Sequence, residues 1–221
     1  MTKRLCWGLL MATVGGCAGQ PRPAPPAPPS AQPSSVSALA AAIDADSKRS
    51  DHETDSKTRA DIAADAGRDA DSCLALEPQA AACLYYRGVA YGLQARAHPA
   101  HAGEYLNHML DALAHADAVD PNYDEAGPSR VRALVLLRAP GWPLGPGDAD
   151  AALVAARRAV ALKPKYPANL LALAEALAKG GDANGARDAY ARARDAAMVM
   201  PASLDRDGWL RESDQGLAKA R

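Results

Sequence analysis

The chain contains no phenylalanine, and aromatic residues make up only 5% of its 221 positions. Runs of β-branched residues are also few, so the sequence carries almost no strand signal and does not predict a β-sheet domain. Positive and negative side chains nearly balance, and the formal net charge of −1 gives no support for nucleic-acid binding. What remains is an alanine-rich, charge-mixed chain punctuated by proline and glycine, a composition typical of helices.

Motifs of the common enzyme classes are missing as well. The chain has no GxSxG elbow, phosphate-binding loop, dinucleotide fingerprint or paired carboxylates on a suitable scaffold. We therefore predict that the protein is not an enzyme and needs no cofactor. His98, His101, His108 and His115 suggest a metal site, but the last three are seven residues apart. On one helix they would stand about 10 Å from one another, too far to share an ion, so no metal is predicted.

A short apolar run near the start of the chain ends in a cysteine. Two basic residues precede the run, which covers residues 5–16, and small residues come before Cys17. The run is too short to cross a membrane, because a membrane-spanning helix needs about 20 apolar residues. It resembles the lipobox of bacterial lipoproteins, with Val14 where the strongest pattern has leucine. The resemblance implies that residues 1–16 are a signal peptide and that Cys17 carries acyl chains.

The same resemblance implies a location. Ala18 and Gly19 follow the cysteine in place of the aspartate that favours inner-membrane retention, which points to the outer membrane, facing the periplasm. An ordinary secretory signal cleaved nearby is the alternative, and it leaves the compartment unchanged. Residues 17–35 are rich in proline and predict an extended tether. Residues 36–221 then form the folded domain.

The second half of the chain repeats itself. Ala152, Ala159 and Pro164 return as Ala186, Ala193 and, less well, Pro201, and both alanine pairs are 34 residues apart. This length and the spacing A-x6-A-x4-P resemble the second helix of the tetratricopeptide repeat (TPR) and the turn after it. Small residues at these positions let the second helix of a pair lie close against the first. The sequence therefore predicts an all-α, TPR-like helical-repeat solenoid of about four helix pairs plus a C-terminal capping helix.

Two insertions interrupt the repeat. Pro78, Pro121 and Pro164 are 43 residues apart, nine more than the repeat length, and the extra residues fall near 95–103 and 139–147. Both insertions lie between the first and second helix of a pair, so they should emerge on one edge of the stack and be neighbours in space. The helices are expected near 36–49, 54–76, 80–95, 103–119, 128–138, 149–162, 167–179, 183–197 and 205–219. Gly180 and Gly181 should form a turn before a helix capped by Asp182.

A narrower resemblance covers roughly residues 60–200. The Gly-Pro-Ser-Arg turn at 127–130, the Pro-Gly-rich loop before Asp148 and the segment 86–92 (YRGVAYG) look like the T component of tripartite ATP-independent periplasmic (TRAP) transporters. That resemblance implies a lipid-anchored periplasmic repeat protein that associates with the solute-binding protein of a transporter. A lipid anchor in the membrane and a periplasmic protein partner are therefore expected.

Peptide-binding members of the repeat family hold a terminal carboxylate with a clamp of lysine and asparagine on the concave face. The corresponding positions here are Tyr85, Val89, Leu171 and Glu175, so the clamp is absent. Such a groove suits apolar or protein-surface contacts better than a carboxylate. Tyr85 is the better contact candidate among the tyrosines of its helix, while Tyr86 and Tyr91 are expected in the core.

Four further residues are candidates for a binding surface. Arg87, Arg130 and Arg132 lie near the starts of successive first helices, where they can meet an acidic partner or form surface salt bridges. Trp142 lies in the rigid loop 140–143, where it either anchors a partner or folds back onto the helices.

Cys73 and Cys83 flank the turn at Pro78. An oxidising periplasm permits a disulfide if the two helix ends come within about 6 Å, and two small buried residues at a tight contact are the alternative.

Three functions remain open from the sequence. The first is a membrane-anchored adaptor that binds a periplasmic protein, the solute-binding component of a TRAP-type transporter. The second is a carrier of a small apolar ligand in a pocket of the repeat stack. The third is a structural lipoprotein of envelope assembly.

Overall fold

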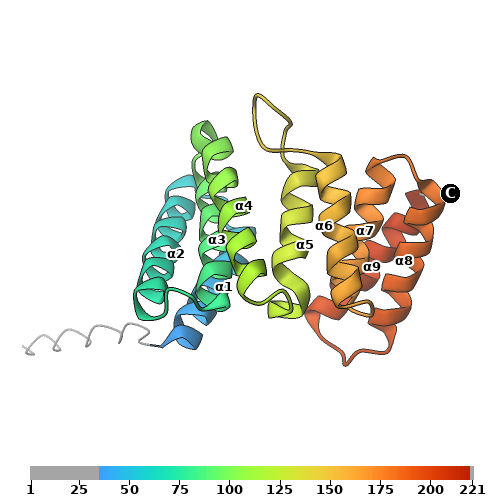
Figure 1. Ribbon diagram of the computed structural model, residues 1–221, viewed down its shortest axis with the longest axis horizontal. Coiled ribbons are helices and arrows are strands. Elements are labelled where there is room, and N and C mark those ends of the chain that lie inside the picture. Colours follow the sequence, from blue (N-terminus) through green and yellow to red (C-terminus); the bar gives the residue numbers. More distant parts are fainter. Residues whose placement is uncertain (1–34, 220–221) are drawn as a thin grey trace, which may run out of the picture. The chain divides into compact units, whose positions relative to one another are not determined.

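The computed structural model describes residues 35–219, which are almost entirely helical. Within this range there are nine α-helices and one short 3-10 turn (Figure 1). The predicted signal peptide, the lipidation site Cys17 and nearly all of the predicted tether lie outside the described residues. The helices are α1 (Val36–His52), α2 (Ser56–Leu76), α3 (Ala81–Ala97), η1 (Pro99–His101), α4 (Ala102–Val119), α5 (Tyr123–Arg138), α6 (Ala149–Leu162), α7 (Pro167–Lys179), α8 (Ala183–Met198) and α9 (Leu204–Lys219).

The predicted fold class is confirmed, and most helix boundaries lie within three residues of the predicted ones. The difference at the start of α5 has a clear physical reason. Residues 124–126 have left-handed backbone dihedrals, and the right-handed helix starts only after them, close to the predicted residue 128. A left-handed helical turn joins the right-handed helix and gives α5 its early start.

Aspartate side chains cap most of the second helices. Asp55, Asp148 and Asp182 accept hydrogen bonds from backbone amides in the first turns of α2, α6 and α8. These bonds satisfy amides that have no partner within the helix and typically contribute about 1 kcal/mol each. The predicted turn before α8 is present too, with Gly181 at φ 85° and Asp182 bonded to the amide of Gly185.

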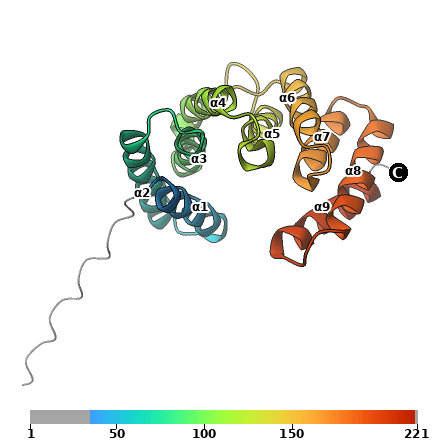
Figure 2. The same ribbon diagram turned by 60° about the horizontal axis from the view of Figure 1, so that its bottom comes forward.

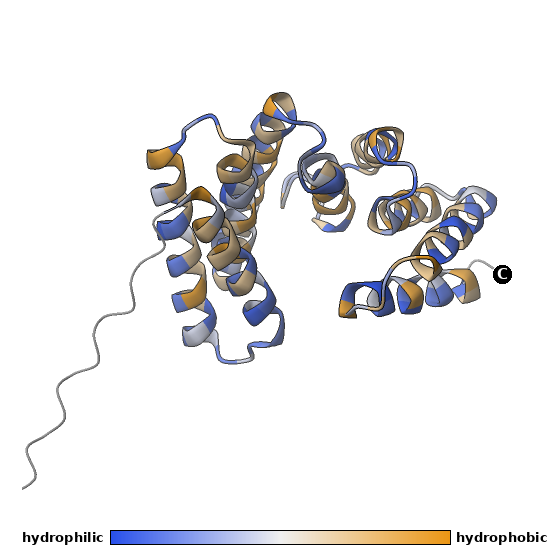
Figure 3. Ribbon diagram, turned by 90° about the horizontal axis from the view of Figure 1, so that it is seen from below, coloured by the Kyte–Doolittle hydropathy of each residue, from blue (hydrophilic) through white to orange (hydrophobic). Residues whose placement is uncertain are grey.

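Consecutive helices pack as antiparallel pairs, and residues 35–219 form a curved row of pairs (Figure 2). The first helices α1, α3, α5 and α7, together with α9, line the inner side of the curve, and α2, α4, α6 and α8 lie outside them. We call the inner side the inner face. Figure 3 shows that hydrophilic and apolar residues alternate around most helices, as expected where each helix buries one face and exposes another.

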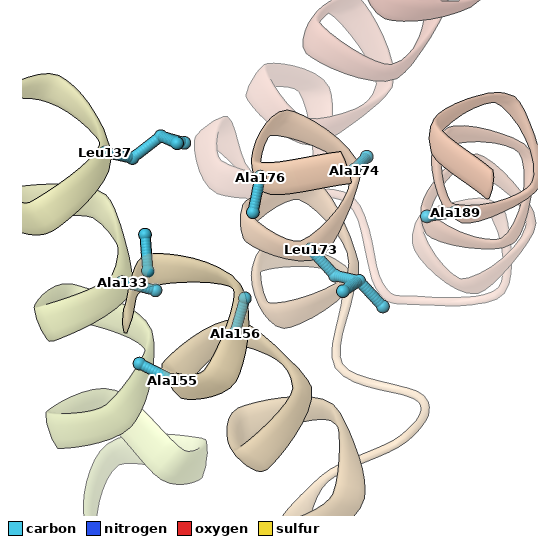
Figure 4. Close-up of a cluster of buried hydrophobic side chains, with 9 residues drawn as sticks. Ala133, Leu137, Ala155, Ala156, Leu173, Ala174, Ala176 and Ala189 are labelled. Carbon is cyan, nitrogen blue, oxygen red and sulfur yellow. The ribbon is translucent and has the colours of Figure 1, made fainter. Parts of the chain in front are cut away.

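Alanine fills the contacts between paired helices, as the repeat pattern predicts. Ala152 and Ala159 of α6 and Ala186 and Ala193 of α8 are all fully buried. Figure 4 shows the cluster where α5, α6, α7 and α8 meet, in which most of the labelled side chains are alanine and Leu137 and Leu173 are the larger ones. Small side chains let the helix axes approach closely, so the predicted packing role of these alanines is confirmed.

The two predicted insertions are neighbours. The first lengthens α3 and α4 around η1, and the second is the loop 139–148 between α5 and α6, at the same edge of the row (Figure 1). A Cβ atom on Gly103 would lie 3.1 Å from the carbonyl oxygen of Leu144, so the two segments are in contact. Among helices α1 to α9, none has the length and apolar character of a membrane span.

Candidate functional site: the inner face of the solenoid

The amino-terminal half of the inner face contains a cavity of about 310 Å³. We call it the groove cavity. Helices α1, α3, α4 and α5 contribute its walls, so it lies at a junction of successive repeats. Its lining residues are Asp44, Ser47, Tyr85, Tyr86, Val89, Gly92, Leu93, Arg96, Met109, Asp124 and Val131.

Asp124 reaches the cavity from a left-handed turn. The φ angles of Asp124, Glu125 and Ala126 are 48°, 54° and 64°. None of these residues is glycine, and a left-handed conformation costs roughly 1–2 kcal/mol per residue for side chains with a Cβ atom. The turn therefore needs support from elsewhere in the fold.

Arg130 provides that support. Its Nη1 donates hydrogen bonds to the carbonyl oxygens of Asp124 (3.1 Å) and Glu125 (3.2 Å), and its Nη2 donates to Asp124 Oδ2 (2.7 Å). The guanidinium also lies over the ring of Tyr166, 5.3 Å from its centroid. Only 9% of Arg130 is exposed, so its charge is used inside the protein rather than offered to a partner.

Asn169 joins the turn to the next repeat. Its Oδ1 accepts a hydrogen bond from Arg130 Nη1 (3.1 Å), and its Nδ2 donates to the carbonyl oxygens of Glu125 (2.9 Å) and Ala159 (3.2 Å). Asn169 is fully buried on α7. Asn169 is not among the residues predicted for the site, although a polar residue inside the apolar stretch 167–174 is a signal visible in the sequence.

Tyr85 is a buried residue in the wall of the groove cavity. Only 7% of the residue is exposed, and its hydroxyl donates to Asp124 Oδ2 at 2.9 Å. Burial, and then the nearby Asp124 carboxylate, raise the pKa of the Tyr85 hydroxyl well above its usual value. The structure thus places this predicted contact residue as a support for Asp124, with its ring against Tyr123.

Tyr86 is the more accessible neighbour. It packs edge to face with Tyr85 at a ring-centroid distance of 5.2 Å. Burial raises the pKa of the Tyr86 hydroxyl, and the carboxylate of Asp44 on α1 adds to the rise. The pKa of Tyr123 is raised by burial and then by Asp124 and Asp44. Both tyrosines are therefore neutral at physiological pH, beside two carboxylates.

The other predicted site residues lie elsewhere. Arg87 Nη1 donates to Asp71 Oδ1 of α2 at 2.6 Å, and its guanidinium lies 4.6 Å from the centre of the Tyr91 ring, which corresponds to the salt-bridge alternative. Arg132 is half-buried, and its Nε has no hydrogen-bond partner in residues 35–219.

Trp142 is 90% exposed, so the loop 139–148 does not fold it back onto the helices. With Leu144 it lines an open cavity of about 760 Å³ between this loop and the start of α4. The structure does not bring Trp142, Arg87 and the groove cavity into one site, because neither Trp142 nor Arg87 lines the groove cavity.

Cys73 and Cys83 form a disulfide, with Cα atoms 5.3 Å apart. Both residues are fully buried and join the end of α2 to the start of α3. The bond therefore links the first helix pair to the second.

The carboxyl-terminal half of the inner face is charged. Arg138 of α5 donates to both carboxylate oxygens of Glu175 on α7, at 3.0 and 2.6 Å, and this hydrogen bonding raises the pKa of the guanidinium. Glu212 of α9 lines the same cavity of about 530 Å³, and burial raises the pKa of its carboxyl group. This half of the groove is thus lined mainly by polar groups.

Metal-ligating side chains do not converge in the described part of the chain, where no group of three or more His, Cys, Asp or Glu residues could hold an ion. His108 stacks on Tyr91 at 5.2 Å instead, and His98 contacts Tyr105.

Comparison with known structures agrees with this architecture. The crystal structure of a thermophilic TPR protein of Thermus thermophilus is similar to 83% of this chain and 84% of its own, with a TM-score of 0.60 and 22% sequence identity. At that identity the likeness shows the fold alone. No model of a protein family matches the chain, and no curated protein matches it. The protein is thus an all-α, TPR-like helical solenoid.

Proposed function

We propose that the protein is a helical-repeat scaffold that binds a protein partner along its inner face. The observation that carries the proposal is the groove cavity, where apolar and polar side chains from four helices meet at a repeat junction. TPR-like solenoids offer an extended concave surface of this kind to partners. The carrier of an apolar ligand is less well supported, because Asp44, Arg96 and Asp124 place charges on the cavity wall.

The finer proposal is that the partner is the solute-binding component of a TRAP-type transporter in the periplasm. It rests on the resemblance of residues 60–200 to the T component and on the lipobox-like segment that ends in Cys17. An adaptor of this kind would act by holding its groove near the membrane.

Capture from a periplasmic extract tests partner binding. Immobilised protein should retain a solute-binding protein, and Val89→Asp, which places a charge on the wall of the groove cavity, should reduce capture at least tenfold. Val154 is two-thirds exposed on the outer helix α6 and does not line the groove cavity, so Val154→Asp is the matched control and should capture as the parent does. Equal loss in both variants, or no capture by the parent, would reject the proposal.

The lipid anchor has its own test. Cys17→Ala removes the thiol that lipidation requires, so the variant should leave the membrane fraction and become soluble, or fail to mature. Retention of the variant in the membrane fraction at the parent level would rule out anchoring through this cysteine.

A further inference from the structure

The groove cavity holds two carboxylates whose charges are only partly compensated. Asp124 Oδ2 receives bonds from Tyr85 and Arg130, but its Oδ1 has no hydrogen-bond partner in residues 35–219, and 43% of the side chain is exposed. Asp44 meets Lys48 at 2.8 Å, one turn along α1, where 70% of the lysine side chain is exposed. Exposed pairs at this spacing contribute only about 0.3–0.5 kcal/mol, so Asp44 is easily available to another cation.

The one cation among the lining residues of the cavity is already engaged. Arg96 Nη1 donates to Asp51 Oδ1 at 2.6 Å and to Ser50 Oγ at 3.4 Å. Arg130, behind Asp124, has its Nη atoms bonded to Asp124, Glu125 and Asn169. The lining thus carries two carboxylates and one guanidinium, and that guanidinium already pairs with a carboxylate outside the lining, so an anionic ligand would meet more like charge than opposite charge.

The rest of the wall suits a cation with an apolar stem. Tyr85 and Tyr86 present aromatic rings, which attract an ammonium or guanidinium group through their π-electrons. Val89, Met109 and Val131 form an aliphatic wall of the kind against which the methylene groups of lysine and arginine pack. At about 310 Å³ the cavity is at the small end of ligand sites, so it suits a side chain better than a large cofactor.

We infer that the groove cavity binds an arginine or lysine side chain presented by the partner protein. The inference rests on the proposed function, which supplies the partner, and names the group that the groove recognises. Asp44 and Asp124 pair with the cationic head, the tyrosine rings cover it, and the aliphatic wall takes its stem. The groove would thus recognise a positively charged group, whereas the clamp that the sequence lacks binds a negatively charged carboxylate.

Nuclear magnetic resonance titration of the ¹⁵N-labelled protein tests this directly. The probe is N-acetyl-arginine methylamide, and the matched control is N-acetyl-citrulline methylamide, which has nearly the same shape and no charge. The arginine probe should shift amide signals of residues 44–47, 85–93 and 124–131 with a millimolar dissociation constant, and citrulline should bind at least fivefold more weakly. Equal binding of the two probes, or no shift of these signals at 50 mM probe, would overturn the inference.

Variants locate the site. Asp44→Asn should weaken the arginine probe about threefold to fivefold, as expected for one exposed ion pair. Asp188→Asn removes a carboxylate of α8 that pairs with Arg192 outside the cavity, and should change nothing. Tyr86→Leu should weaken binding where Tyr86→Phe does not, because phenylalanine keeps the ring. Asp124 is left intact because it supports the left-handed turn.

The test of the cationic pocket and the test of partner capture can fail independently. If the parent captures a partner and Asp44→Asn captures it equally well, the scaffold proposal stands and the cationic pocket is rejected. If the arginine probe binds as expected but no partner is captured, the pocket stands as a cation site and the scaffold proposal fails.

Discussion

Arg130 links the backbone of one repeat to the side chains of the next. Its two Nη atoms donate four hydrogen bonds, to the carbonyls of a left-handed turn, the carboxylate of Asp124 and the amide oxygen of Asn169, and no lysine could contact all of them at once. The residue thus compensates for a backbone conformation that is unfavourable by itself. Its importance lies in the folded state rather than in contact with a partner.

Replacing Arg130 by methionine should lower the free energy of unfolding by about 3 kcal/mol, since buried carbonyls and a carboxylate lose their partner. Urea unfolding followed by circular dichroism measures the change. Arg192→Met is the matched control, because Arg192 forms an exposed pair with Asp188 at 3.5 Å and should cost less than about 0.5 kcal/mol. A similar small loss for both variants would contradict the role of Arg130.

Asp46 gives a prediction for pH. Burial raises the pKa of its carboxyl group, although Arg49 lies 2.9 Å away, and Asp65 and Asp69 add to the rise. The charged form is therefore less favourable in the folded than in the unfolded state, so stability is lost as pH rises from the unfolded to the folded pKa. Asp46→Asn should raise the melting temperature by about 2 °C at pH 7 and leave it unchanged at pH 3. A rise of equal size at both pH values would rule out titration as the cause.

At the scale of the element, two adjacent glycines of the α7–α8 turn differ in backbone conformation. Gly180 has φ −77°, which any residue adopts, whereas Gly181 has φ 85°. A Cβ atom at Gly181 would meet nothing within 4 Å, so only its own backbone opposes a side chain there. Substituting each of the two glycines therefore measures the energetic cost of a left-handed backbone for a residue with a side chain, without a steric clash.

Gly181→Ala should destabilise the protein by about 1 kcal/mol, because alanine must adopt a left-handed conformation. Gly180→Ala should be neutral or stabilising by up to about 0.5 kcal/mol, because alanine loses less chain entropy on folding. Thermal unfolding of the two variants side by side measures the difference. Equal melting temperatures would show that the turn rearranges when Gly181 is replaced.

Elements whose signals are local were predictable from the sequence. The prolines at 78, 121 and 164, the Asp182 cap and the alanine spacing place helices within a few residues, because each signal acts within one turn of helix. The left-handed turn at 124–126 was not predictable, because Arg130 and Asn169 stabilise it and Asn169 comes from the next repeat. Likewise Tyr85 was predicted as a contact residue of the groove, but its burial was not predictable, because it depends on Asp124 and Tyr123, almost 40 residues away.

At the scale of the whole described domain, each helix pair contacts chiefly its neighbours, so stability is expected to vary along the row. The end pairs have a neighbour on one side only and should open first. The Cys73–Cys83 bond should make the first pair harder to open, since it joins that pair to the second.

Reducing this disulfide, or replacing both cysteines by alanine, should lower the free energy of unfolding by about 2.5 kcal/mol for a closed loop of this length. Hydrogen exchange should become faster mainly in α1 and α2 and stay nearly unchanged in α7 and α8. Hydrogen exchange measured by mass spectrometry, with and without reductant, reports on α1 and α2 and on α7 and α8 in the same sample. Uniform acceleration along the chain would show that the row unfolds as one cooperative unit.

The position of the disulfide also decides how the domain would bear a mechanical load. If the protein is held at its amino-terminal side, as lipidation at Cys17 would require, a pulling partner in the groove would draw force through α1 and α2 first. Those helices lie at the end of the row and have a neighbouring pair on one side only. A covalent bond between α2 and α3 holds the end of α2 to the start of the helix that carries Tyr85 and Tyr86, so tension could not pull these two helix ends apart while the disulfide is intact.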